Sequence, residues 1–73
     1  MSITNICECL KQARAYKDSG EYELSVIQLK QGLELNANNE ELHLELGRAY
    51  CGKKDYTLAI EEFSVVQKLN PSH

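Results

Sequence analysis

The sequence lacks the residues on which many small domains depend. Its 73 residues contain no tryptophan, one proline and three cysteines. Cys7, Cys9 and Cys51 form no disulfide framework, because their number is odd and their spacing is irregular. We therefore expect a reducing compartment, the cytoplasm.

Long apolar runs are also missing. No segment approaches the roughly 18 consecutive apolar residues that a membrane-spanning helix requires. Residues 1–5 lack both the basic and the apolar part of a signal peptide. These absences argue against a membrane-spanning or secreted protein.

The charge is mixed rather than one-sided. The net charge is −3, and the chain has no basic stripe of the kind that neutralises nucleic-acid phosphates. No Ser/His/Asp, Cys/His or phosphate-loop arrangement can be assembled. On a helix, Cys7 and Cys9 would point about 200° apart, so they could not share a metal. We expect no enzyme, no cofactor, no metal site and no nucleic-acid partner.

What the sequence does contain is a repeat. Displacing the chain by 34 residues, so that Leu10 meets Leu44, places many residues on identical ones, and a period in this range indicates stacked repeats. The other identical pairs include Arg14/Arg48, Ala15/Ala49, Tyr16/Tyr50, Tyr22/Tyr56, Leu24/Leu58, Leu35/Leu69 and Asn36/Asn70. We expect a lead-in over residues 1–5 and two units, 6–39 and 40–73.

The first unit carries the pattern of two helices. Asn5 can cap the first helix, with Glu8 at the capping-box position three residues on. Gly20 suits a left-handed helix end, and residues 36–39 form a turn. The apolar positions at helical spacing are Ile6, Cys9, Leu10, Ala13 and Tyr16, followed by Tyr22, Val26, Leu29 and Leu33.

The second unit follows the same plan. Asn38 or Asn39 caps its first helix, Asp55 is a plausible cap for its second, and Pro71 ends it. The apolar positions are Leu42, Leu46, Ala49 and Tyr50, followed by Tyr56, Ala59, Ile60, Phe63, Val66 and Leu69. Because no segment alternates as a strand does, the predicted fold class is all-α.

The second unit resembles the tetratricopeptide repeat family. The shared spacing is His43-x2-Leu46-Gly47-x2-Tyr50, then Ala59-x3-Phe63, then Pro71, with His43 in the slot usually held by tryptophan. The first unit is similar to a degenerate copy. The resemblance covers residues 6–73 and implies antiparallel helical hairpins, stacked as a short right-handed solenoid of four helices. It also implies a scaffold for protein–protein interaction.

The pattern predicts how the helices pack. Gly47 and Ala59 are small and let the two helices of one hairpin approach closely, and Gly32 has this role in the first unit. Tyr50 and Phe63 are large and should fill the space toward the neighbouring unit. We also expect His43 to be packed and the four tyrosines, which recur with the repeat, to be core residues.

A stack of two such hairpins is unfinished, because about three or more repeats are usually needed. The last helix should therefore expose apolar residues, and the candidates for self-association are Ile60, Phe63, Val66 and Leu69. Two interpretations stay open. Copies cover one another, as a two-fold homodimer or by exchanging a helix, or the repeats are a fragment of a larger multidomain protein.

The resemblance further implies a binding surface, because the first helices of the hairpins line the inner face of such stacks. Arg14 and Arg48 should stand roughly 8–10 Å apart on adjacent helices and, with nearby lysines, hold a carboxylate or an acidic segment of a partner. Alternatively, both arginines are solvated or pair with Glu45 and Asp18. The expected partner-binding residues are Leu10, Lys11, Arg14, Lys17, Leu44, Glu45 and Arg48, with Cys7, Glu41 and Cys51 in the remaining inner slots.

Overall fold

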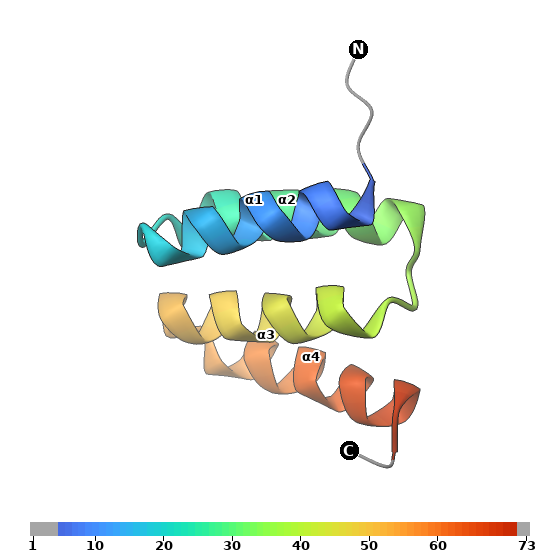
Figure 1. The fold of residues 1–73 in the computed structure, drawn as a ribbon. Coiled ribbons are helices and arrows are strands. Elements are labelled where there is room, and N and C mark those ends of the chain that lie inside the picture. The colour runs from blue at the N-terminus through green and yellow to red at the C-terminus, as the bar shows by residue number, and fades with distance from the viewer. Residues whose placement is uncertain (1–4, 72–73) are drawn as a thin grey trace.

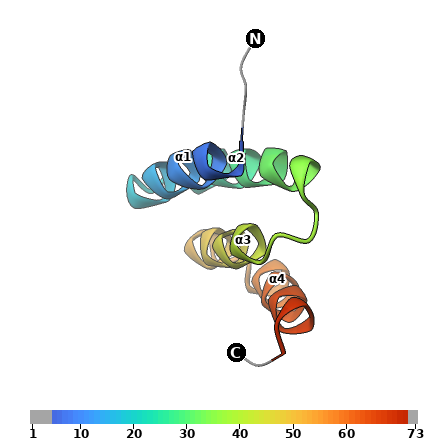
Figure 2. The ribbon, with the colours of Figure 1, turned by 45° about the vertical axis from the view of Figure 1, so that its right-hand side comes forward.

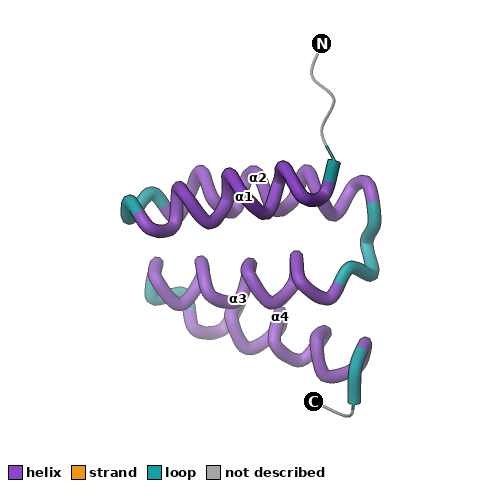
Figure 3. The backbone as a smooth tube through the Cα atoms, viewed as in Figure 1, coloured by secondary structure: helices purple, strands orange, loops and turns teal. Residues whose placement is uncertain are grey.

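A computed structural model describes residues 5–71 as four helices joined by short turns (Figure 1). They are α1 (Ile6–Asp18), α2 (Tyr22–Leu35), α3 (Glu40–Lys53) and α4 (Tyr56–Leu69). Successive helices run in opposite directions, and only helices and loops occur over the described residues (Figure 3), which confirms the predicted all-α hairpins. Residues 1–4 of the expected lead-in and residues 72–73 of the second unit lie outside the described part.

The helix starts repeat with the sequence. Asn5 and Asn39, 34 residues apart, both precede a helix, and each side chain accepts a hydrogen bond from the third helical backbone N–H, at 2.8 and 2.9 Å. Asp55 caps α4 in the same way through a longer contact of 3.5 Å. These bonds satisfy backbone donors that the helix itself cannot pair, so the predicted caps are confirmed, with Asn39 chosen over Asn38.

The two hairpin bends share one backbone conformation but differ in residue type. Gly20, after α1, has φ +82°, and Lys54, at the equivalent position after α3, has φ +66°. Glycine adopts this left-handed conformation freely, whereas a residue with a Cβ does so at a cost of about 1–2 kcal/mol. The second bend is therefore held in place by packing of the helices on either side of it.

The hairpins form two layers, α1 with α2 and α3 with α4 (Figure 2). α3 touches all three other helices, whereas α4 packs against α3 alone among the described residues. One core runs through both layers, and its buried members are Leu10, Ala13, Val26, Leu29, Leu42, Leu46, Ala49, Tyr50 and Ala59. The apolar faces predicted for α1, α2 and α3 are thus the faces that pack.

Aromatic rings lie directly on glycines at two of the helix contacts. A Cβ added at Gly47 would collide with the ring of Phe63 on α4, and one added at Gly52 would collide with the ring of Tyr22 on α2. Phe63 therefore packs inside its own hairpin, so the expectation that it reaches toward the other unit is wrong. The reason is the hole left by the missing side chain of Gly47.

The four α4 residues expected to be exposed are not equivalent. Ile60 is 64% exposed, whereas Val66 is 7% exposed, so the expectation for Val66 is wrong. Val66 lies on the side of α4 that α3 covers. Phe63 is half-buried on Gly47. Leu69 is exposed but lies nine residues beyond Ile60, which places it on the opposite side of the helix.

The close contact at Gly47 gives a test of this packing. An alanine in a helix interior is ordinarily more stable than glycine by roughly 0.5–1 kcal/mol. Because the added methyl group would collide with Phe63, we expect Gly47→Ala to lower the free energy of unfolding by about 1–3 kcal/mol, measured by urea denaturation. The control is Ser64→Ala at an exposed position of α4, which should leave the stability unchanged or raise it slightly. A stabilised Gly47→Ala variant would contradict the described contact.

Candidate functional site

Both predicted arginines lie at one carboxylate. Arg14 on α1 donates from Nε to Glu45 Oε2 at 3.1 Å, and Arg48 on α3 donates from Nη1 to the same oxygen at 3.2 Å. Lys17 Nζ lies 3.8 Å from the other oxygen of Glu45. The alternative that the arginines pair with Glu45 is confirmed. Asp18, which the structure also describes, takes no part in these contacts.

The carboxylate at the centre of this cluster is buried. Glu45 is 4% exposed, and removing a lone carboxylate from water is costly unless cations and hydrogen bonds compensate. Arg14 also donates from Nη2 to Glu41 at 3.2 Å. The hydrogen bond to Glu45 is the main reason that the pKa of Arg14 lies above its ordinary value; partial burial opposes the rise, and Glu41 adds to it. The cluster therefore joins α1 to α3 with three positive groups around one buried negative group.

The cluster leaves part of each arginine open to solvent. The side chains of Arg14 and Arg48 remain 46% and 53% exposed, and a guanidinium has more N–H donors than these contacts use. Lys11 is exposed and Leu44 half-buried, whereas Leu10 is buried. Of the predicted partner-binding residues, Leu10 and Glu45 thus offer little surface, and the other five remain accessible.

An open hollow lies beside the cluster. It has a volume of about 510 Å³ and is lined by Asn5, Cys7, Glu8, Leu10, Lys11, Arg14 and Glu41. Its volume falls within the range of about 300–1,000 Å³ that is usual for ligand pockets. Basic and acidic groups share its rim, and Leu10 contributes an apolar part. The hollow brings the N-terminal halves of α1 and α3 together into one surface.

The inner slots of α1 and α3, which we call the inner face, differ in charge from the rest of the chain. Four of these slots are basic and two are acidic, although the whole chain carries a net charge of −3. The basic members are Lys11, Arg14, Lys17 and Arg48, and the acidic members are Glu41 and Glu45. A positive surplus is therefore gathered on this side of an acidic protein.

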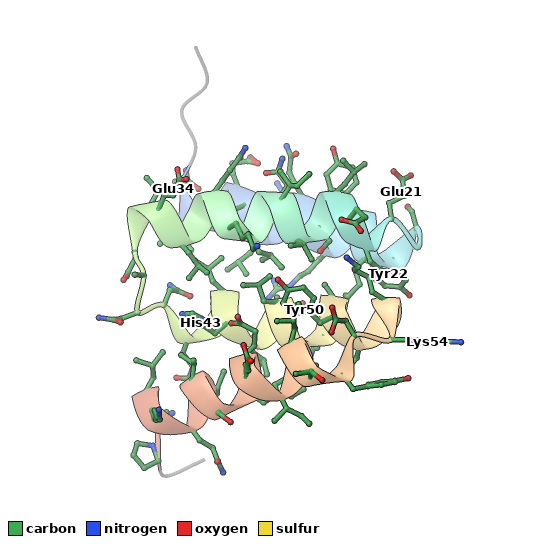
Figure 4. All side chains as sticks on the ribbon, turned by 180° about the vertical axis from the view of Figure 1, so that it is seen from behind. Glu21, Tyr22, Glu34, His43, Tyr50 and Lys54 are labelled. Carbon is green, nitrogen blue, oxygen red and sulfur yellow. The ribbon has the colours of Figure 1, made fainter. Side chains whose placement is uncertain are left out.

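His43 is a packed residue, as predicted from its slot. Its Nε2 donates to the carbonyl oxygen of Ala37 at 2.8 Å, and its Nδ1 lies 2.7 Å from Glu62 Oε1 (labelled in Figure 4). Both neighbours are hydrogen-bond acceptors, so an imidazolium with N–H on each nitrogen satisfies both. His43 thus ties the turn before α3 to α4. No group of three or more potential metal ligands occurs among residues 5–71.

The tyrosines are only partly the core residues that we expected. Tyr50 is buried, and Tyr16 and Tyr22 are half-buried. Tyr22 points from α2 toward the C-terminal end of α3, where its ring lies on Gly52 (Figure 4). Tyr56, the repeat equivalent of Tyr22, is 58% exposed, so the core prediction is wrong for this residue. No helix packs on α4 in the way that α3 packs on α2.

The cysteines are all free, and they differ in environment. Cys9 is buried, whereas Cys7 and Cys51 are exposed. Burial, with a smaller contribution from the negative charge of Glu8, raises the pKa of the Cys9 thiol. Cys9 therefore acts as a small hydrophobic residue in the core, as its position in the pattern predicted.

Comparison with known families gives one match. A family model described as a TPR repeat matches residues 13–53, more than half of the chain. The matched segment includes the second half of α1, all of α2 and all of α3. No curated protein shows significant sequence similarity to the chain. None of the helices described has both the length and the hydrophobicity needed to cross a lipid bilayer.

The buried carboxylate can be tested by Glu45→Gln. This change keeps the side-chain shape but removes the charge that holds two arginines, so we expect unfolding free energy to fall by about 1–2 kcal/mol at neutral pH. Urea denaturation measures the loss, and the loss should shrink in high salt because part of the interaction is screened. Glu61→Gln, at an exposed position of α4, is the control. Equal stabilities of the two variants would show that Glu45 is not a structural link.

Thiol reactivity tests the burial of Cys9. In the native protein, a thiol reagent should modify Cys7 and Cys51 rapidly. Cys9 should react more slowly by at least about two orders of magnitude, because a buried thiol with a raised pKa needs local unfolding to react. Mass spectrometry of the labelled peptides follows each site. All three sites should react alike in denaturant, and equal rates in the native protein would contradict the structure.

Proposed function

The chain belongs to the tetratricopeptide repeat family, a family of protein–protein interaction scaffolds, and we propose that it binds a segment of a partner protein on its inner face. The observation that carries this proposal is the cluster at Glu45, which holds Arg14 and Arg48 side by side while leaving about half of each side chain exposed. Donors fixed in this way lose little further conformational freedom when a partner binds.

The chemistry of the surface favours an acidic partner segment. Its basic surplus stands out against the negative charge of the chain, and opposite charges speed association and fix its orientation. Arg48 makes a single hydrogen bond to Glu45, so its other N–H groups are available for a carboxylate of the partner. The hollow beside Arg14 is the proposed place for an apolar side chain of the same segment.

The proposed role is non-enzymatic and cytoplasmic. A scaffold needs a shaped surface rather than a reactive group, and the polar groups of this surface are held in ion pairs with one another. The free state of all three cysteines suits a reducing compartment.

A second candidate function is self-assembly. Ile60 and Tyr56 on α4 are 64% and 58% exposed, and large exposed apolar groups often mark association surfaces. In that case assembly itself, as a homodimer or by helix exchange, would be the role of the chain. The molecular mass in solution separates this candidate from the binding of a partner segment.

The inner face can be tested with a library of short random peptides displayed for binding to the full chain. We expect selection of peptides that combine Asp or Glu with an apolar residue, because the surface offers basic groups beside a hollow. The double variant Lys11→Glu with Arg48→Gln should weaken binding of these peptides about tenfold or more. Fluorescence anisotropy at low and high salt measures the change.

The control for this experiment has the same charge change elsewhere. Lys30→Glu with Lys68→Gln alters exposed positions on α2 and α4, away from the inner face, and should leave the Kd unchanged. Circular dichroism confirms that both double variants are folded. Selection of basic or uncharged peptides, or equal effects of the two double variants, would refute the proposed surface.

A further inference from the structure

α2 and α4 hold equivalent places in the two hairpins but have different neighbours. Their bounds, Tyr22–Leu35 and Tyr56–Leu69, are 34 residues apart at both ends. α2 lies between α1 and α3, whereas α4 contacts only α3 within the part of the chain that the structure describes. α4 therefore forms the end of the stack (Figure 2). The α4 surface that corresponds to the α3-covered side of α2 has no helix on it.

Equivalent side chains on the two helices differ in burial because of this missing neighbour. Val26 on α2 is 7% exposed, and its counterpart Ile60 is 64% exposed. Leu29 is fully buried, whereas its counterpart Phe63 is only half-buried. The difference thus arises from packing rather than from polarity, since all four residues are apolar.

The bare surface of α4 is also uncharged along its length. Residues at helical spacing form what we call the α4 strip: Tyr56, Thr57, Ile60, Phe63, Ser64 and Gln67. All are exposed except Phe63, which is half-buried. In a chain with 26% charged residues, an exposed strip of this length without charge is notable, because charged residues are depleted at the centres of interfaces.

The first hairpin shows what kind of element covers such a surface. α3 lies on α2 with Leu42 against Gly32 and with Gly52 beneath the Tyr22 ring. The buried stripe between these contacts contains Leu46 and Ala49. A helix with leucine and alanine along one side, and with a glycine where it crosses a tyrosine ring, is therefore the complement of the α2 surface.

The same comparison argues against a second copy stacking head to tail. In such a stack α1 would have to cover α4 as α3 covers α2. The α1 residues at the positions of Leu42, Leu46, Ala49 and Gly52 are Glu8, Gln12, Ala15 and Asp18, all of them exposed. Only Ala15 matches, and the shallow hollow over it is bordered by Lys11 and Gln12. Burying Glu8 and Asp18 against the uncharged strip would leave carboxylates without compensation.

We propose that the α4 strip is a second binding site, separate from the inner face, for one amphipathic helix of a partner protein. The partner helix runs antiparallel to α4, as α3 runs to α2. Its contact side is uncharged, with glycine or alanine over Tyr56 and a leucine or isoleucine beside Ile60. Where α3 places Leu42 over Gly32, the partner carries a smaller residue, because α4 has Val66 at that position.

A peptide of residues 39–54, which contains all of α3, is the probe for this site. Added to the full chain labelled with ¹⁵N, it should shift the backbone resonances of the α4 strip in a saturable manner. The substitution Ile60→Glu should weaken this binding at least tenfold. Because Ile60 is exposed, the variant should fold normally, and circular dichroism checks this.

Two controls make the result specific. A peptide of residues 5–20, which contains all of α1 with its polar outer positions, should not bind. Ile27→Glu, at an exposed apolar position of α2, should leave binding of the α3 peptide unchanged. If neither peptide binds, or if binding of the α3 peptide survives Ile60→Glu and thus reflects displacement of α3 itself, the proposal is overturned.

Light scattering of the full chain over a concentration series provides the remaining arm. The proposal predicts a constant monomer mass, because the strip awaits a helix from another protein. A dimer that forms with rising concentration and is abolished by Ile60→Glu would assign the strip to a second copy and would reject the partner helix. A dimer that is insensitive to Ile60→Glu, with α3-peptide binding that remains sensitive to it, would support the proposal.

Discussion

The structure depends on the close approach of the other helices to α3. Gly47 receives the ring of Phe63 from α4, and Gly52 receives the ring of Tyr22 from α2. Each contact requires a residue without a side chain on α3, since even one methyl group would overlap the ring. Dispersion and burial then act over two large aromatic surfaces. Without these two glycines, the hairpins could not keep the spacing that forms one continuous core.

The polar side of the same helix has a different role. Glu45 is buried where α1 meets α3, and the arginines of the two repeats converge on it. A buried carboxylate contributes little net stability but fixes geometry, because any other arrangement leaves the charge uncompensated. The same residue that joins the hairpins therefore also sets the position of the basic groups on the inner face. Fold and candidate binding surface share one cluster.

Local features of the sequence predicted local features of the structure. The asparagine caps, the glycine bend and the apolar stripes depend on neighbours within one helical turn, so periodicity and spacing were sufficient. The contacts of Arg14 with Glu45 and of His43 with Glu62 connect different helices. The pattern left the first as one of two alternatives and did not predict the second, because helix spacing does not specify how long side chains orient. The errors at Val66 and Tyr56 have a related cause: periodicity identifies an apolar residue but not whether a neighbouring helix covers it.

The two ends of the stack differ in a way that gives the molecule a direction. The outer side of α1 carries charged and amide groups, whereas the corresponding end at α4 is uncharged. In the language of tiling, the chain is a starting tile: it has one finished edge and one edge able to accept a neighbour. Units of this kind do not propagate into fibres by themselves, because fibre growth needs two complementary edges on every copy. Limited assembly is thus encoded by a few polar residues on a helix that contributes little else to that end.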